Sequence, residues 1–285
     1  MRRHAASNVL KALLLVAMLA LVFAAFGWVV SGSRGGVLFA FSSLLAASAV
    51  YAYGDRALLG MLGARPFALA EDPLLRSTTD RIASALRVAR PKLYVIDDGF
   101  PRAFVVGRGR QGATLAVSTG LLHALTPAEL EAVIAHEIAH VRLLDVLTQT
   151  FAVLLSTTLV EMSRLGGWLS RGLLAVLAPV GAAFTHALLS PRRELAADAM
   201  AASVVDPHDL ADALVRLDQA AELVDFVASP ATEPLYVVDP FDHRDRLARM
   251  FATHPALQER VALLRGAGSG ASGAPAAGEE TTKGP

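Results

Sequence analysis

The sequence predicts a mainly α-helical integral membrane protein with a small β-sheet in a domain outside the bilayer. Of its 285 residues, 54% are hydrophobic and only 18% are charged, and the mean hydropathy is +0.46. Ordinary soluble domains are more polar than this. Long uncharged runs alternate along the chain with charged segments, which is typical of several membrane helices. One charged segment contains short β-type runs followed by an amphipathic helical pattern, and this predicts the small sheet.

The charge balance and the absence of cysteine argue against two classes of site. Lysine plus arginine and aspartate plus glutamate each number 26, so the formal net charge is zero and we expect no nucleic acid partner. There is no cysteine, which excludes disulfides and thiolate metal sites. Any zinc ion would have to be bound by histidine and carboxylate side chains.

Residues 1–56 predict an N-terminal transmembrane hairpin. The runs 12–33 and 35–54 contain no charged residue, and each is long enough to cross a hydrocarbon core of about 30 Å as a helix. A cleaved signal peptide is the alternative for the first run, but its apolar region would be unusually long and the second run follows at once. Three basic residues precede the hairpin and only Arg34 lies in its turn. The positive-inside rule therefore places both ends of the hairpin in the cytoplasm.

Residues 57–145 predict the first part of a domain outside the membrane. A helix is expected from Glu71 to Arg90, where Pro91 ends it. Three short strands are expected, namely Leu93–Ile96, Ala103–Val106 and Ala113–Val117. We expect the last of these, which precedes the next helix, to lie at a free edge of the sheet, where an extended peptide could pair with it.

The segment from His136 to His140 has the pattern H-E-x-x-H. Thr126-Pro127-Ala128-Glu129 is typical of a capping box with proline at the first helical position, and an apolar face at helical spacing follows. On a helix the two histidines, His136 and His140, lie one turn apart on the same face, so both rings can bind one zinc ion. Glu137 could then accept a proton from a water molecule on the metal. A chance pattern on an ordinary helix is the alternative.

Residues 146–191 predict a second hydrophobic hairpin. The runs 146–160 and 172–191 are uncharged, but the first is shorter than a membrane span usually needs. It could cross as a continuation of the preceding helix or lie in the membrane interface. A buried helical hairpin of the soluble domain is the alternative. His186 lies in the second run, where a lone histidine is more often a packed residue than a metal ligand.

Residues 192–265 predict the second part of the domain. Glu194 and Asp198 are four residues apart, so a helix would present both carboxylates on one face. Glu194 could be a third zinc ligand, and Asp198 could accept the second N–H of a ligand histidine; a solvated acidic pair is the alternative. The segment 229–249 is expected to be a loop. Residues 266–285 are rich in Gly, Ala, Ser and Pro and predict a disordered tail.

Four separated stretches together resemble one family. They are Thr119-Gly120-Leu121-Leu122, the H-E-x-x-H segment, Arg193-Glu194-x-x-Ala197-Asp198 and Thr253-His254-Pro255. In this order and spacing they resemble the HtpX-like membrane metalloproteases, which are relatives of the zinc prenyl-protein endopeptidases. The resemblance runs from the N-terminal hairpin to about residue 265. It implies a gluzincin-type α+β metalloprotease domain, with His136, His140 and Glu194 on Zn²⁺ and Glu137 as the general base.

The resemblance also implies a function. The chain would be a multi-pass protein of the cell membrane whose catalytic domain faces the cytoplasm. It would use zinc to cleave polypeptides, namely misfolded or damaged membrane proteins. His254 is a candidate donor to the oxyanion of the reaction, although a structural histidine at a helix start is an equal alternative.

Other functions remain open on the sequence alone. A non-catalytic membrane scaffold or adaptor with a structural zinc site is the main alternative. A protease with a lumenal chamber would need more membrane spans than the four apolar runs found. A transporter is disfavoured because neither N-terminal span contains an acidic residue.

Three positions depart from the pattern of the resembled family. Arg102 stands where that family often has Asn before the Ala-Phe pair, Pro191 where an Arg is common, and Ala256 where a second Pro is common. These departures affect the expected substrate contacts and the local geometry, but the expected zinc ligands and base are all present.

Overall fold

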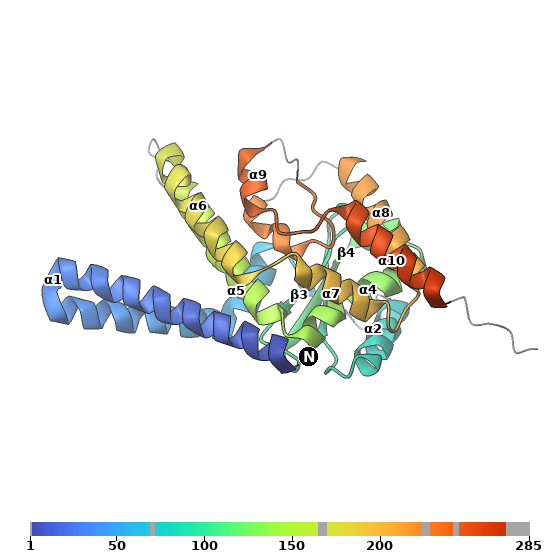
Figure 1. Cartoon of the computed structure of the whole chain (residues 1–285), viewed down its shortest axis with the longest axis horizontal. Coiled ribbons are helices and arrows are strands. Elements are labelled where there is room, and N and C mark those ends of the chain that lie inside the picture. Colours follow the sequence, from blue (N-terminus) through green and yellow to red (C-terminus); the bar gives the residue numbers. More distant parts are fainter. Residues whose placement is uncertain (1, 69–71, 165–169, 224–228, 242–244, 272–285) are drawn as a thin grey trace, which may run out of the picture.

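The computed structural model describes residues 2–68, 72–164, 170–223, 229–241 and 245–271. Its first helix, α1 (Arg2–Met61), is broken at Ser31 and Gly32, where the backbone leaves helical geometry and Gly32 has φ +64°. Figure 1 shows two rods of α1 that lie side by side and project from the body of the molecule. A Cβ atom on Gly27 would overlap the backbone of Gly35, so the two rods approach closely because both positions lack a side chain.

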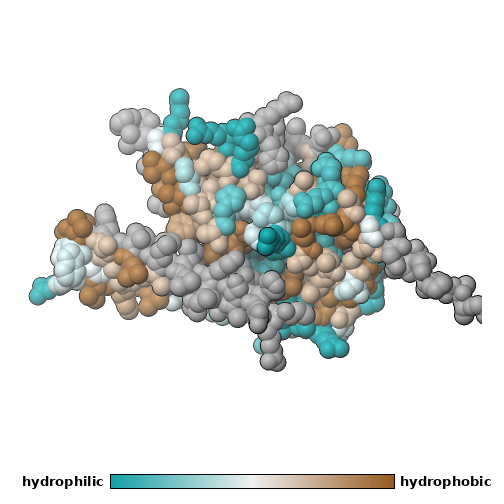
Figure 2. All heavy atoms as spheres, in the orientation of Figure 1, coloured by the Kyte–Doolittle hydropathy of each residue, from teal (hydrophilic) through white to brown (hydrophobic). Residues whose placement is uncertain are grey.

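The described side chains on the outer surface of α1 are mostly apolar. Large hydrophobic side chains are exposed along it, including those of Trp28, Val29, Leu38 and Phe41. In Figure 2, brown side chains lie near the outer end of the α1 projection, while the body carries a mixture of teal, pale and brown side chains. The segment Gly27–Met61 is long and apolar enough to cross a membrane. A large exposed apolar surface of this kind is typical of contact with lipid.

Helix α2 (Pro73–Ala85) is shorter than the sequence predicts. The Asp72 side chain caps its start by accepting hydrogen bonds from the backbone N–H groups of Leu74 and Leu75. Leu86 ends the helix, and Arg87 takes a left-handed conformation with φ +55°. The expected continuation to Arg90 is therefore wrong, because the chain leaves the helix before Pro91 can end it. Glu71 lies outside the described residues.

A four-stranded sheet follows, with the strand order β1-β2-β4-β3. Strands β2 and β4 are parallel, and the other two pairs are antiparallel. Strand β3 lies at the edge of the sheet and β4 lies inside it, so the expectation of a free edge on the strand before the helix is wrong. The strands are β1 (Arg65–Pro66), β2 (Lys92–Ile96), β3 (Ala103–Gly107) and β4 (Ala113–Ser118).

Both faces of the sheet are covered. Ala103 and Val105 of β3 point into a core formed with α2, α4 and α8. Phe104 and Val106 point to the other face, into a core with the end of α1, with α5 and with the short 3₁₀ helix η2. This explains why every residue of β3 and β4 is buried instead of every second one.

The remaining helices pack against the sheet or against one another. Part of 229–249, expected to be a loop, contains η2 and the beginning of α9. Helix α10 continues past the expected boundary at 266, and the residues beyond 271 lie outside the described part of the chain. The bounds are α3 (Thr119–Ala124), α4 (Pro127–Leu143), α5 (Val146–Arg164), α6 (Ser170–Leu188), α7 (Arg192–Ala201), α8 (Pro207–Leu223), η2 (Pro230–Leu235), α9 (Arg246–Phe251) and α10 (Leu257–Ala271).

Helices α5 and α6 pack against each other. The Ser156 hydroxyl donates to the carbonyl oxygen of Gly181 at 2.9 Å and lies 2.7 Å from the Thr185 hydroxyl, so polar contacts join the two helices. Nε2 of His186 lies 2.9 Å from the carbonyl oxygen of Met250, so this histidine packs against α9. By length and composition, α4 with α5 and α6 with α7 could each form a bent membrane span.

Candidate active site

Helix α4 carries the H-E-x-x-H segment, and its ends are formed by local interactions. The Thr126 hydroxyl accepts from the backbone N–H of Glu129 at 3.3 Å, and Oε2 of Glu129 accepts from the backbone N–H of Thr126 at 2.8 Å. The predicted capping box is therefore confirmed. Leu144, in a left-handed conformation, ends the helix. Twelve residues of α4 are buried, so the motif lies inside the protein body.

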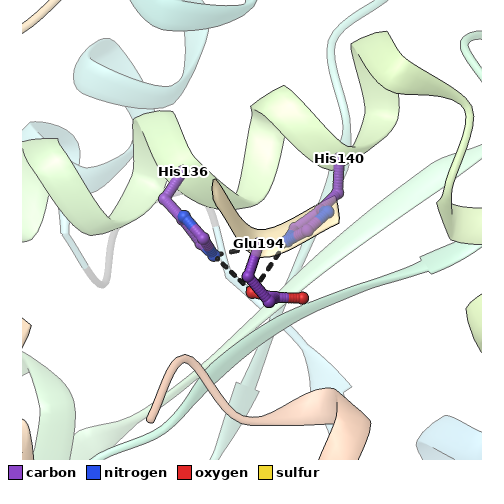
Figure 3. Close-up of side chains that lie close together, drawn as sticks. All are labelled: His136, His140 and Glu194. Carbon is purple, nitrogen blue, oxygen red and sulfur yellow. Dashed lines mark hydrogen bonds and ion pairs between the residues drawn. The ribbon is translucent and has the colours of Figure 1, made fainter. Parts of the chain in front are cut away.

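The side chains of His136, His140 and Glu194 converge on one point (Figure 3). The two Nε2 atoms are 3.2 Å apart, and Oε2 of Glu194 lies 3.4 Å from Nε2 of His136 and 3.6 Å from Nε2 of His140. A tetrahedral zinc ion with bonds of about 2.0–2.1 Å keeps its ligand atoms roughly 3.3 Å apart. The spacing and the donor types therefore fit a metal ion bound by two imidazoles and one carboxylate.

The second ring nitrogen of each histidine faces a carboxylate. Nδ1 of His136 lies 2.8 Å from Oδ1 of Asp198, and Nδ1 of His140 lies 3.3 Å from Oδ2 of Asp145. The guanidinium of Arg260 donates to both oxygens of Asp198, at 2.7 and 2.8 Å. These carboxylates orient both rings so that Nε2 points towards the metal cluster, by which we mean the group His136, His140 and Glu194. This is the arrangement that ligand histidines need.

Glu137 lies beside the two histidines on α4. Its side chain is 3% exposed, and its Oε2 atom has no hydrogen-bond partner among the described residues. A buried carboxylate oxygen without a partner is costly to keep in a folded protein, so its retention points to a chemical role.

The side chain of His254 lies near Glu194 of the metal cluster. Its Nδ1 lies 2.6 Å from Oε1 of Glu233. Its Nε2 lies 3.8 Å from Oε2 of Glu194 and has no hydrogen-bond partner in the part of the chain that the structure describes. Burial would lower the pKa of His254, but the carboxylate of Glu233 raises it above the ordinary value. Burial would raise the pKa of Glu233, but His254 and Thr253 hold it below its ordinary value. The raised pKa favours the protonated imidazole, which carries a hydrogen on Nε2 that can be donated.

A second set of hydrogen bonds holds η2 against the cluster. The guanidinium of Arg193 donates to Oε1 of Gln149 at 3.0 Å and to the carbonyl oxygen of Pro234 at 3.1 Å. The amide of Gln149 donates to the same carbonyl oxygen at 2.8 Å. Arg193 also lies 3.0 Å from Oε1 of Glu194 through its Nε. Helices α5 and α7 are joined here to the helix that carries Glu233.

Three of these groups were not assigned a role from the sequence. Asp145, Glu233 and Arg260 contact the predicted site residues only after folding. Arg260 reaches Asp198 across 62 positions of the chain, and Glu233 reaches His254 across 21. No periodic pattern marks such distant partners, and Glu233 lies in a segment that has the composition of a loop.

The departures from the resembled family lie outside the metal cluster. Arg102 forms an ion pair with Asp98 at the turn before β3. Pro191 precedes α7 in a helical conformation, with φ −55° and ψ −28°. The carbonyl oxygen of Ala256 accepts from the backbone N–H of Arg260 at 3.2 Å and so takes part in starting α10.

Comparison with known proteins identifies the family. The chain matches the family model described as "Peptidase family M48" over residues 69–267. A curated protein named "Protease HtpX homolog" from Acidiphilium cryptum (strain JF-5) is 41% identical over 279 residues, which cover 90% of this chain and 96% of that protein. A protein of the same name from Pelotomaculum thermopropionicum (strain DSM 13744 / JCM 10971 / SI) is 33% identical, with 90% and 98% covered.

A solved structure entitled "Crystal Structure of S. mikatae Ste24p" is similar with a TM-score of 0.48 at 17% sequence identity. The similarity covers 93% of this chain and 66% of that one. The assignment of the chain to a family rests on the length of the family match and on the curated relatives. With a His–His–Glu cluster suited to a metal ion and a helix able to cross a membrane, the chain belongs to peptidase family M48 and is a membrane-bound metalloprotease that acts on polypeptides.

Proposed function

We propose that this protein is a zinc-dependent endopeptidase in which His136, His140 and Glu194 bind the metal. The observation that carries the proposal is the convergence of three ligand atoms at distances of 3.2–3.6 Å. Two neutral imidazoles and one carboxylate are a common ligand set of catalytic zinc, which keeps a fourth position open. When bound, zinc polarises the carbonyl group of the substrate and makes water more acidic.

The protein's own groups perform the proton transfers. Glu137 accepts a proton from the attacking water at Oε2, the oxygen that no described residue bonds, and returns it to the leaving amine. His254 donates from Nε2 to the oxyanion that develops on the substrate carbonyl. Glu233 holds the imidazole ring of His254 in the orientation that this donation needs. Asp198 orients the ring of His136 from the side away from the metal.

The proposed substrates are misfolded or damaged membrane proteins, cleaved at the cytoplasmic face of the cell membrane. The apolar surface of α1 and the charge distribution around it support this location. We further propose that 146–191 forms a second hairpin associated with the bilayer, which makes the protein multi-pass.

A scaffold with a structural metal site is the alternative that the first experiment must exclude. A structural site needs no buried carboxylate with a free oxygen beside the metal, so Glu137 favours catalysis. Wild type and Glu137→Gln, purified in detergent and matched for zinc content, are compared for cleavage of casein as an unfolded substrate.

We expect wild type to cleave casein at internal peptide bonds and Glu137→Gln to lose turnover by a factor on the order of 10³ or more while it retains zinc. Cleavage by the variant at the wild-type rate would remove Glu137 from its role. Equal inactivity of both proteins with zinc bound, on casein and on an unfolded membrane protein alike, would favour the scaffold.

A further inference from the structure

Gln149, on α5, is a buried polar side chain that the proton transfers proposed above do not use. It is 2% exposed. Its amide nitrogen donates to the carbonyl oxygen of Pro234 at 2.8 Å, and its amide oxygen accepts from the guanidinium of Arg193 at 3.0 Å. An amide can donate and accept at the same time without a net charge. Burial of such a group is costly unless both ends are paired, so the two hydrogen bonds hold the Gln149 side chain in one place.

The carbonyl oxygen of Pro234 is the point where three helices meet. It accepts a second hydrogen bond from Arg193 of α7 at 3.1 Å, so Gln149, Arg193 and η2 are all bonded to one another. Nε of the same guanidinium lies 3.0 Å from Oε1 of Glu194, while Oε2 of Glu194 faces the two histidines. Because a guanidinium is planar and its donors point in fixed directions, the bond to Gln149 helps to fix its plane.

Glu233 carries this arrangement from Pro234 to His254. It precedes Pro234 in η2 and is 1% exposed. Its Oε1 accepts from the backbone N–H of Thr253 at 2.8 Å and from that of His254 at 3.1 Å, and it lies 2.6 Å from Nδ1 of His254. Its Oε2 accepts from the Thr253 hydroxyl at 2.7 Å. The position of η2 therefore determines where both the backbone and the ring of His254 lie.

We propose that Gln149 is a positioning residue for His254, an inference that rests on the endopeptidase function and the oxyanion donor proposed above. Gln149 holds the carbonyl group of Pro234, and thereby keeps Glu233 where it orients the imidazole. A donor stabilises the oxyanion only from hydrogen-bond distance and in the right direction. A small displacement of η2 therefore weakens the donation from His254 without removing any group that binds the metal.

A purely structural role of Gln149 in the packing of α5 is the alternative. Gln149→Met removes both hydrogen bonds and keeps a flexible side chain of similar length. Ser156→Ala is the matched control because Ser156 is buried on the same helix and its hydroxyl donates to Gly181 of α6 instead of to η2. Each variant removes buried hydrogen bonding of α5, but only Gln149→Met removes a bond to Pro234.

The test combines kinetics with a measurement that does not depend on turnover. Zinc-loaded wild type, Gln149→Met and Ser156→Ala are compared for kcat and KM on a peptide that wild type cleaves, and for zinc affinity. Hydrogen exchange followed by mass spectrometry reports the peptides that contain Thr253 and His254, whose backbone N–H groups both bond to Glu233. The variants His254→Ala and Gln149→Met/His254→Ala complete a double-mutant cycle.

We expect Gln149→Met to lower kcat by about tenfold, with KM within about twofold of wild type and zinc affinity unchanged. The backbone N–H groups of Thr253 and His254 should exchange faster by about tenfold, because their acceptor moves with η2. In the His254→Ala background, Gln149→Met should lower kcat by less than about twofold. Ser156→Ala should resemble wild type in kcat and in the exchange of these two groups.

Three outcomes would overturn the proposal. Unchanged kcat and exchange in Gln149→Met, or equal losses in Ser156→Ala, would leave the protease intact and remove the positioning role. A full further loss of kcat in the His254→Ala background would show that Gln149 acts through another group. Absence of cleavage by zinc-loaded wild type would overturn the endopeptidase and, with it, the role of Gln149 in the reaction.

Discussion

Each histidine of the metal cluster has its two ring nitrogens in different surroundings. Nε2 faces the cluster, and Nδ1 faces Asp198 in His136 and Asp145 in His140. Arg260, itself buried, neutralises the charge of Asp198 with two hydrogen bonds. Burying this ion pair would be unfavourable without such geometry, so we expect it to add little to the stability of the fold. We interpret its role as holding Asp198 in the position that orients His136.

At the residue scale, the ligand role of Glu194 can be tested directly. Glu194→Ala removes the carboxylate oxygen that completes the cluster, so we expect zinc affinity to fall by more than about 100-fold. Metal content after dialysis against a graded chelator gives the measurement. Glu259→Ala, an exposed glutamate on α10, is the control and should bind zinc like wild type. Full zinc retention by Glu194→Ala would place the third ligand elsewhere.

The pair Glu233 and His254 offers a second test at this scale. Glu233→Gln removes the charge that orients the imidazole but keeps the size of the side chain. Because an oxyanion donor acts in the transition state, we expect kcat to fall by about 10–100-fold with little change in KM. In a His254→Ala background the same change should have almost no further effect on kcat. Additive losses in the double variant would show that Glu233 does not act through His254.

At the element scale, hydrogen bonds join the turn before β3 to the start of α3. The backbone N–H of Gly120 donates to the carbonyl oxygen of Asp98 at 2.8 Å, and the Thr119 hydroxyl donates to the same oxygen at 3.0 Å. Asp98 in turn holds Arg102. Thr119 and Gly120 thus hold the loop that leads into β3. This is a physical reason for the Thr-Gly pair in the stretch Thr119-Gly120-Leu121-Leu122 of the family pattern.

The close approach at Gly120 predicts a specific loss of stability. A Cβ atom there would overlap the carbonyl group of Gly99, so Gly120→Ala should destabilise the protein by about 1–3 kcal/mol and lower its Tm in detergent. Gly112→Ala is the matched control because no heavy atom lies within 4 Å of its added Cβ. Equal Tm values for the two variants would contradict the close packing of the turn.

Helix α5 contacts both α1 and the sheet. Its Gln149 takes part in the hydrogen bonds that hold η2, and its Thr157 and Glu161 line a cavity near the beginning of β3. A Cβ on Gly54 of α1 would contact Leu154 of α5, so α1 and α5 also lie against each other. One helix therefore contacts both the apolar projection and the helix that carries Glu233.

At the scale of the whole molecule, the proposed topology predicts which surfaces face outside the cell. The chain has no cysteine, so a single introduced cysteine reports one position only. A membrane-impermeant maleimide should label Ser33→Cys, in the turn of α1, on intact cells. It should label Ser84→Cys, on the exposed side of α2, only after the membrane is permeabilised. The opposite pattern would place the catalytic domain outside the cytoplasm.

The sequence by itself determined the features that depend on near neighbours in the chain. The capping box at Thr126, the one-turn spacing of His136 and His140 and the apolar character of α1 all follow from residues a few positions apart. Such features are readable because helix periodicity and end-capping act locally. The end of α2 at Leu86 was missed, because the left-handed Arg87 and not Pro91 stops that helix.

Only the tertiary structure decided which distant groups meet. It brought Glu194 to the two histidines and distinguished it from a solvated acidic residue, and it paired Arg260 with Asp198 and Glu233 with His254. It also placed β3 and not β4 at the edge of the sheet. These contacts join residues far apart in the chain, and their energies depend on burial and mutual geometry that no local pattern records.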